Sequence, residues 1–188
     1  MAWVIWLTGL PGSGKTTIAR EFIQLIDTTH CFEMLRLDAL RKRIVPHPDY
    51  DEKERDTLYN ALGVMADLLQ QHGVNVLIDA TAHRKKWRDR AREYIDEFYE
   101  VYMKCPVDIC MERESHRSDN LIVSDMYRKA LERKKLQDQG KSTPDYDVGE
   151  VIGIDVPYEE PDHPELIIET DTLSPEKGAR LIYEMLTP

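Results

Sequence analysis

Residues 2–26 read AWVIWLTGLPGSGKTTIAREFIQLI, and the order of residue types in this stretch decides the fold. Its first part, Trp3 to Leu7, is short, apolar and rich in residues that favour strands, which predicts a buried strand. The run from Gly9 to Gly14 predicts a tight turn. The part that follows has apolar residues at helical spacing: Ile18, Phe22, Leu25 and Ile26. The stretch therefore predicts a strand, a glycine-rich loop and a helix over 15–26.

The loop carries a phosphate-binding motif. Residues 9–16, GLPGSGKT, match G-x-x-x-x-G-K-[ST] in full, between a predicted strand and a predicted helix as the motif requires. Glycines let backbone amides turn inward around phosphate oxygens at the positive end of the helix. We expect ATP to bind to these residues: Gly9, Pro11, Gly12, Ser13, Gly14, Lys15, Thr16 and Thr17. Lys15 is expected to be catalytic by reaching the β- and γ-phosphates, and the Thr16 hydroxyl to hold Mg²⁺.

The rest of the chain alternates strands and helices. Further strands are predicted at 31–37, 74–78, 99–103 and 166–168, and further helices at 51–72, 84–96, from 107, at 125–137 and from 174. Because the strands are apolar throughout, they indicate a parallel sheet covered on both faces. We predict an α/β, doubly wound fold of the P-loop NTPase type, with about five strands in one domain over 1–188. The polar, irregular segment 115–163 is interpreted as a lid over a ligand.

The composition limits the partners and the location. The 188 residues are 41% hydrophobic and 32% charged, with 25 Lys and Arg against 35 Asp and Glu, a net charge of −10. That balance argues against general nucleic-acid binding through phosphates. The sequence has no 18-residue apolar run and no secretory signal at its start, so we expect no membrane contact and a cytoplasmic location. The three cysteines, Cys31, Cys105 and Cys110, are expected to be reduced and packed as small hydrophobes.

Two aspartates follow predicted strands. Asp38 and Asp79 come at the carboxyl ends of strands, where parallel sheets bind ligands. Asp38 is expected to be catalytic by orienting or deprotonating an acceptor hydroxyl, and Asp79 to hold Mg²⁺. Each could instead be the N-cap of a following helix, because Asp is a favoured cap.

Basic residues lie in two parts of the sequence, after the second predicted strand and around the predicted lid. Arg113, just before the predicted lid, is expected to be catalytic by neutralising charge on the transferred phosphoryl group. Other basic residues could serve the lid or an anionic substrate, or lie on solvated helix faces: Arg36, Arg41, Arg43, Arg117, Arg128 and Lys129. His83 could act as a base or bind substrate, because the ordinary pKa of histidine lies near neutrality, but with no visible partner it is expected to be a polar surface residue.

Segments along most of the chain resemble adenylylsulfate (APS) kinases. They are GLPGSGKTTIAR, LDALR, 55–79, RDRAR at 88–92, FYEVYMKCPVDICMERE at 98–114 and GIDVPYEEPDHPELIIETD at 153–171. The string from Gly153 to Pro161 is the most distinctive, because a P-loop is common to many families. The resemblance implies transfer of the γ-phosphate of MgATP to the 3′-hydroxyl of APS, and it implies a possible homodimer. It assigns acceptor binding to Asp38, Arg41, Arg84 and Ile154.

The resemblance is weaker on the acceptor side. APS kinases typically have Asp-Gly-Asp-x-x-Arg after the second strand, and Arg36 replaces the first aspartate here. The family's other acceptor contacts fall on changed residues: Leu58, Asn60, Ala61 and Val151. Loss of a bidentate arginine and of a stacking aromatic weakens binding of a nucleotide phosphosulfate.

Three hypotheses follow for the function. The first is an ATP- and Mg²⁺-dependent kinase whose small-molecule substrate is APS. The second is a P-loop kinase for another hydroxyl acceptor, such as a sugar, a nucleoside or a polynucleotide end. The third is a nucleotide-binding protein without transfer activity. A dinucleotide site is excluded because Thr17 replaces the required third glycine, and no serine-hydrolase or zinc-protease motif is present.

Overall fold

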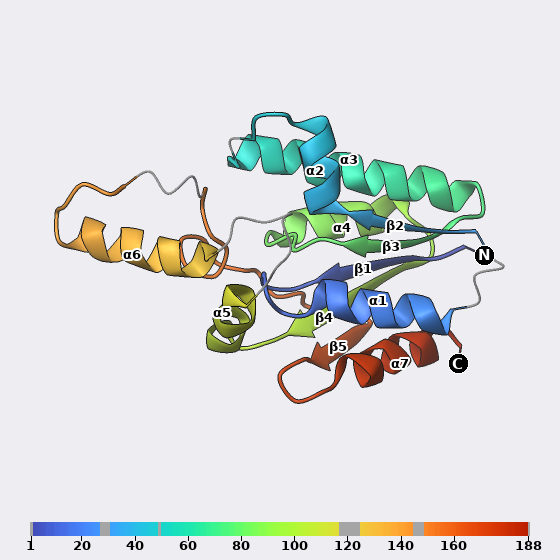
Figure 1. The fold of residues 1–188 in the computed structure, drawn as a ribbon. Helices are drawn as coiled ribbons and strands as arrows, with labels where there is room; N and C mark the ends of the chain where they lie inside the picture. The colour runs from blue at the N-terminus through green and yellow to red at the C-terminus, as the bar shows by residue number, and fades with distance from the viewer. Residues whose placement is uncertain (1, 27–30, 49, 117–124, 145–148, 188) are drawn as a thin grey trace.

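A computed structural model describes residues 2–26, 31–48, 50–116, 125–144 and 149–187. In these ranges five parallel strands form one sheet in the order β2-β3-β1-β4-β5. The strands are β1 (Val4–Thr8), β2 (Phe32–Arg36), β3 (Asn75–Asp79), β4 (Phe98–Lys104) and β5 (Leu166–Glu169). Because β1 is central, the loop that follows it lies at the middle of the carboxyl edge of the sheet (Figure 1). The predicted α/β class and strand number are confirmed.

Helices cover both faces of the sheet. One face packs against α1 (Lys15–Leu25) and α7 (Pro175–Leu186), and the other against α3 (Glu52–Gln71) and α4 (Lys85–Tyr94) (Figure 1). Alternate residues of β1 serve the two cores: Ile5 and Leu7 pack on the α1 side, Val4 and Trp6 on the α3 side. All four are fully buried, which explains the continuous apolar run in the sequence.

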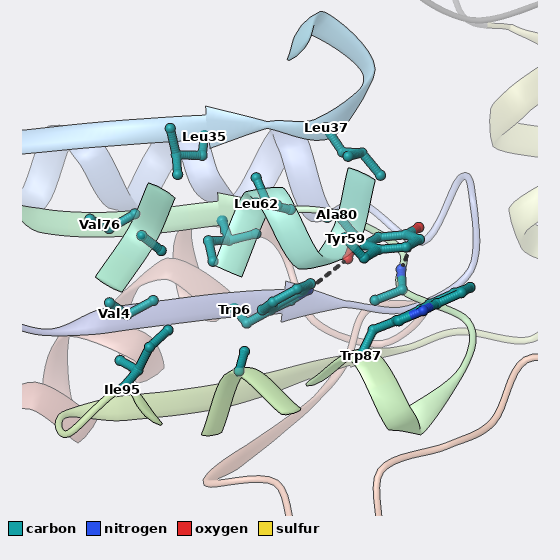
Figure 2. Packing of buried hydrophobic residues seen from close by; sticks show 14 of the residues in the cluster. Val4, Trp6, Leu35, Leu37, Tyr59, Leu62, Val76, Ala80, Trp87 and Ile95 are labelled. Atoms are coloured by element: carbon teal, nitrogen blue, oxygen red, sulfur yellow. Dashed lines mark hydrogen bonds between the residues drawn. The ribbon is translucent and has the colours of Figure 1, made fainter. Parts of the chain in front are cut away.

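The core on the α3 side contains a stack of aromatic rings. The rings of Trp6 and Tyr59 lie 6.4 Å apart, and those of Tyr59 and Trp87 lie 4.3 Å apart, both nearly parallel (Figure 2). Two hydrogen bonds from this stack reach the turn after β3. Trp6 Nε1 donates to the Ala80 carbonyl oxygen, and the Tyr59 hydroxyl accepts from the Ala82 amide. The core thus also positions the carboxyl end of β3.

One helix was absent from the sequence predictions. Strand β2 ends at Arg36, and α2 (Leu37–Ile44) begins at the next residue. The sequence predicted a strand over 31–37, so Leu37, the first residue of α2, was assigned to the strand. Asp38 therefore lies in the first turn of a helix whose N-cap is Arg36. The N-cap alternative for Asp38 is wrong.

The remaining helices lie at the carboxyl edge of the sheet. They are α5 (Val107–Ser115) and α6 (Met126–Asp138), and α6 extends away from the sheet (Figure 1). Gly12 approaches α5 so closely that an added Cβ would overlap the Cys110 carbonyl oxygen, and its φ is +82°. Only glycine fits there.

The structure also bears on the predictions for the cysteines and for membrane-spanning helices. Cys105 and Cys110 are free and buried, but Cys31 is exposed at the start of β2, so the packing prediction is wrong for Cys31. None of the helices in the described ranges has the length and apolarity needed to cross a bilayer.

A buried leucine on α3 tests this packing. Leu62→Ala should lower the free energy of unfolding by about 2 to 5 kcal/mol, because Leu62 is fully buried between α3 and the sheet. Chemical denaturation measures the change. Leu68→Ala on the same helix is the matched control, because that side chain is 51% exposed, and it should change stability by less than about 0.5 kcal/mol. Equal losses in the two variants would contradict the packing described here.

Candidate active site

The glycine loop surrounds its own lysine. Lys15 Nζ donates hydrogen bonds to the carbonyl oxygens of Gly9 and Leu10, at 2.9 and 2.8 Å. Gly14, the N-cap of α1, has a φ of +91°, a backbone conformation that glycine tolerates. The amides at the start of α1 therefore face the same space as the lysine ammonium, and this combination suits a phosphate group.

A carboxylate of β3 meets the loop. The Thr16 hydroxyl donates to Asp79 Oδ2 at 2.6 Å, and Arg36 Nε lies 3.6 Å from the same oxygen. Arg36 and Asp79 are direct partners in the register of β2 and β3. The helix after Asp79 begins only at Lys85, with Arg84 as its N-cap, so the N-cap alternative for Asp79 is also wrong. Asp79, on β3, instead contacts both Arg36 at the end of β2 and Thr16 beside the phosphate loop.

The turn after β3 is held by side chains from several elements. The Thr8 hydroxyl donates to the Thr81 carbonyl at 2.6 Å and lies 2.8 Å from the Tyr158 hydroxyl. Arg88, which is 1% exposed, donates to the carbonyl oxygens of Ala82 and Glu159 and pairs with Glu100 on β4. With the bonds from the aromatic stack, these contacts determine where the backbone of residues 80–82 runs.

A cavity of about 550 Å³ opens at this edge. Its lining comes from the glycine loop and the start of α1, from α2 with the segment after it, from α3, and from the end of β3 with the two residues after it. Single residues of α5 and α6 and the segment 149–152 complete it. The lining residues from the loop and the beginning of α1 are Pro11, Gly12, Gly14, Lys15, Thr16 and Thr17. Asp38, Arg41, Asp79 and Arg113 line the same cavity. Residues that the sequence predicted to bind ATP, the acceptor and Mg²⁺ thus line the same cavity.

Gly9 and Ser13 are loop residues that do not line the cavity. Gly9 lies against the Met103 carbonyl, where an added Cβ would come within 2.5 Å of the oxygen. Ser13 is fully buried, and its hydroxyl has no hydrogen-bond partner among the described residues. Both residues therefore pack against the protein interior and do not face the cavity.

One wall of the cavity is built around Arg41. Arg41 Nε lies 3.3 Å from Glu54 Oε1, and its guanidinium lies 4.7 Å from the centre of the Tyr50 ring. Glu54 also accepts the Tyr50 amide at 3.0 Å and donates its own amide to Asp51 Oδ1 at 2.7 Å. This capping arrangement at the start of α3 holds the arginine and the tyrosine on the cavity wall.

Arg55 and Tyr59 also line the cavity, although neither was predicted from the sequence. Arg55 is 5% exposed, and its Nη2 donates to the Glu150 carbonyl at 2.8 Å. Burial lowers the pKa of Arg55 from its ordinary value. The signal was an arginine and a tyrosine four residues apart on the apolar face of α3. Two positions of this helix at which the sequence differs from the family's acceptor contacts do not line the cavity: Leu58 is in the core, and Asn60 is exposed.

Arg113 reaches the loop from α5. Its Nη2 donates to the Thr170 carbonyl at 2.7 Å, and Nη1 lies 3.6 Å from Cys105 Sγ. The guanidinium also lies 4.0 Å from the position that a Cβ of Gly14 would occupy. The charge of Arg113 is thus fixed beside the phosphate loop by the end of β5.

Several other predicted residues lie away from the cavity. Arg84 Nη1 donates to Glu159 Oε1 at 3.0 Å, and Ile154 packs with Val151 against α5 and α6. Ala61 lies on α3 outside the cavity lining, whereas Val151 lines it. Roles in acceptor binding for Arg84 and Ile154 stay predictions.

The remaining basic residues differ in exposure. Arg43 and Lys129 lie on α2 and α6 outside the cavity lining. Arg128 is 64% exposed and pairs with its helix neighbours Asp125 and Glu132, so its setting is that of a solvated face. Arg117 lies outside the described residues.

The prediction for His83 is wrong. His83 is 3% exposed, and its ring lies edge-on against Trp87 with centroids 5.0 Å apart. Its Nδ1 has no hydrogen-bond partner among the described residues. Burial, followed by the charges of Arg55 and Arg84, lowers the pKa of His83 to about 4. The histidine is therefore neutral at pH 7.

Comparison with known families and proteins gives one consistent result. The family model of adenylylsulphate kinase matches residues 1–169. A probable adenylyl-sulfate kinase of Archaeoglobus fulgidus is 30% identical over 172 residues, which is 91% of this chain and 97% of that protein. The adenylyl-sulfate kinase of Rippkaea orientalis is 33% identical over 186 residues, covering 97% of this chain and 90% of that protein.

Solved structures share the fold. The APS kinase CysC of Mycobacterium tuberculosis, in complex with AMPPNP and APS, has a TM-score of 0.80 and 25% identity, covering 100% of this chain and 98% of that one. The shikimate kinase of Acinetobacter baumannii, in complex with shikimate, has a TM-score of 0.56 and 16% identity, covering 100% of this chain and 94% of that one. The second likeness shows the fold alone.

The buried histidine makes stability depend on pH. The folded pKa of about 4 lies below the ordinary 6.5, so between these values the unfolded chain binds the proton more readily. His83 therefore costs stability as the pH falls from 6.5 towards 4, by up to about 1.4 kcal/mol per pH unit. In His83→Gln the free energy of unfolding should fall less steeply over this window. Denaturation of both proteins at several pH values checks this, and parallel curves would contradict the burial of a neutral imidazole.

Proposed function

The chain belongs to the adenylylsulphate kinase family, and we propose that its cavity brings ATP and adenylylsulfate together and transfers the γ-phosphate to the 3′-hydroxyl of the acceptor. The products are ADP and 3′-phosphoadenylylsulfate. The chain is thus an ATP-dependent phosphotransferase with an alcohol-group acceptor. One observation carries the proposal: the same cavity is lined by the phosphate loop, by Asp38, and by Arg41 and Arg55.

The donor half is the loop and its surroundings. Loop amides and Lys15 would hold the β- and γ-phosphates, because backbone N–H groups and an ammonium are fixed there. Arg113 would stabilise negative charge on the transferred group, since Thr170 holds its guanidinium beside Gly14. Positioning and charge supply most of the catalysis in phosphoryl transfer, and this half provides both.

The acceptor half lies between α2, α3 and the segment 149–152. Asp38, in the first turn of α2, would accept the proton of the attacking hydroxyl as the new phosphorus–oxygen bond forms and the bond to ADP breaks. Arg41 and Arg55 would pair with the anionic phosphosulfate, and both are held ready by carboxylate or carbonyl partners. Tyr50 and Tyr59 add aromatic surface to the same wall.

The donor set beside the loop suits Mg²⁺. Thr16 Oγ1 and Asp79 Oδ2 are 2.6 Å apart, and hydroxyl and carboxylate oxygens are ligands that Mg²⁺ prefers. Mg²⁺ bound there would neutralise charge on the transferred phosphate. Arg36, beside Asp79, keeps this carboxylate directed at Thr16.

Assembly and location are proposed on family grounds alone. APS kinases commonly form homodimers, and we extend this to the chain together with a cytoplasmic location. Neither point bears on the chemistry of the cavity, because residues of one chain line the cavity described above.

The acceptor is tested by coupled release of ADP. Purified protein with MgATP should release ADP only when APS is added, and the product should carry a new 3′-phosphate. APS is titrated from low concentration, because APS kinases are inhibited by excess APS. Protein that binds ATP and yet ignores APS would overturn the proposed acceptor, and a panel of sugars, nucleosides and polynucleotide ends would then identify the hydroxyl used.

The loop lysine tests the donor half. Lys15→Ala should lower turnover by about a thousandfold or more, because it removes the charge that faces the β- and γ-phosphates. Lys177→Ala, an exposed lysine on α7, is the matched control and should keep normal turnover. Thermal unfolding of both variants shows that the fold is kept. Normal activity in a folded Lys15→Ala protein would exclude this mechanism.

A further inference from the structure

The string from Gly153 to Pro161, the most distinctive part of the sequence, lies directly after a wall of the cavity. Residues Gly149 to Ile152 line the cavity as four successive residues. They have no strand or helix of their own, so other groups must hold their backbone. The contacts of this wall segment, residues 149–152, show which groups do so.

Asp155 holds the wall segment from within the string. Asp155 Oδ2 accepts the Val151 amide at 2.7 Å, across a tight turn closed by the Asp155 amide and the Val151 carbonyl at 2.8 Å. Gly153, inside this turn, has a φ of +94°. The turn is therefore formed by the Gly-Ile-Asp sequence itself, and its carboxylate points back to the wall.

Arg133 holds the same segment from α6. Its Nη2 donates to Asp155 Oδ2 at 2.6 Å and to the Gly149 carbonyl at 3.1 Å. Arg133 and Asp155 are each 20% exposed, so the ion pair is mostly shielded from solvent. One guanidinium thus binds both the start of the wall segment and the carboxylate that caps it, and such charge-assisted bonds are strong.

Arg55 completes the arrangement from α3. Its Nη2 donates to the Glu150 carbonyl at 2.8 Å. The backbone of the wall segment is therefore bonded to side chains of both α6 and α3. Arg55 itself lines the acceptor half of the cavity, so a shift of the wall moves a group that faces the acceptor.

We propose that Arg133 and Asp155 are positioning residues for the acceptor: their ion pair sets the wall segment against Arg55 and thereby the shape of the acceptor half of the cavity. Neither residue lines the cavity, so they act through the backbone of Gly149 to Ile152. Among the described residues, the hydrogen bonds of this pair given above go to each other and to the backbone of residues 149 and 151, and none of them goes to the phosphate loop. The effect should therefore fall on the acceptor and spare ATP.

The inference rests on the proposed function, and steady-state kinetics with APS and ATP test it. Arg133→Met should raise the KM for APS by about tenfold, because a shielded charge-assisted pair is lost, while the KM for ATP stays within about twofold. Asp155→Ala should have an effect of similar size. The double variant should be little worse than either single variant, because both changes remove the same interaction.

Arg128→Met is the matched control on the same helix. Arg128 pairs with Asp125 and Glu132, three residues before and four residues after it, and its side chain is 64% exposed. The control should leave both KM values unchanged. Arg133→Lys keeps the charge and should restore part of the APS affinity. Equal effects of Arg133→Met and Arg128→Met, or a KM for ATP that rises as much as that for APS, would overturn the proposal.

Hydrogen exchange separates this inference from the proposed function. In protein without substrates, the Val151 amide should exchange faster in Arg133→Met and in Asp155→Ala than in the parent or in Arg128→Met. This readout needs no acceptor. Inactivity of the parent with APS would sink the proposed acceptor alone, whereas unchanged exchange at Val151 would sink the positioning role even in an active enzyme. Arg133→Lys serves in place of Arg133→Met if the latter does not fold.

Discussion

The close approach of Gly12 to α5 is the constraint on which the site depends. An added Cβ at Gly12 would overlap the Cys110 carbonyl oxygen, so the loop can approach α5 this closely only with a glycine at position 12. This contact fixes α5 relative to the loop, and α5 carries Arg113. The donor half therefore follows from one steric condition at the middle of the sheet edge, together with the register that places Asp79 beside Thr16.

The donor half could be predicted from sequence because its signals are local. A strand, a glycine loop and a helix within residues 2–26 carry the motif, and the apolar runs indicated each strand of the parallel sheet. Helix α2 was missed since it follows β2 without a turn and is only eight residues long. Even so, Asp38 and Arg41 reach the cavity, because they lie one turn apart on that short helix.

The acceptor half could be predicted only in part, because long-range packing places its residues. Arg55 and Tyr59 were missed, since nothing local separates a buried arginine on an amphipathic helix from an exposed one. His83 was expected at the surface, and yet the stack formed by Trp6, Tyr59 and Trp87 buries it. The substituted positions Leu58 and Asn60 lie outside the cavity. The positions that the resemblance pointed to on this helix are therefore not the ones that line the cavity, which Arg55 and Tyr59 do.

The bond between Thr8 and Tyr158 joins residues 150 positions apart. Ribosomes make the P-loop strand before the Gly153 string, and β5 and α7 follow both. A nascent chain that already contains the whole nucleotide motif still lacks the group that binds the end of β1. Contacts of such sequence separation slow folding. The end of β1 therefore gains this contact only after the Gly153 string has been made, long after the nucleotide motif itself.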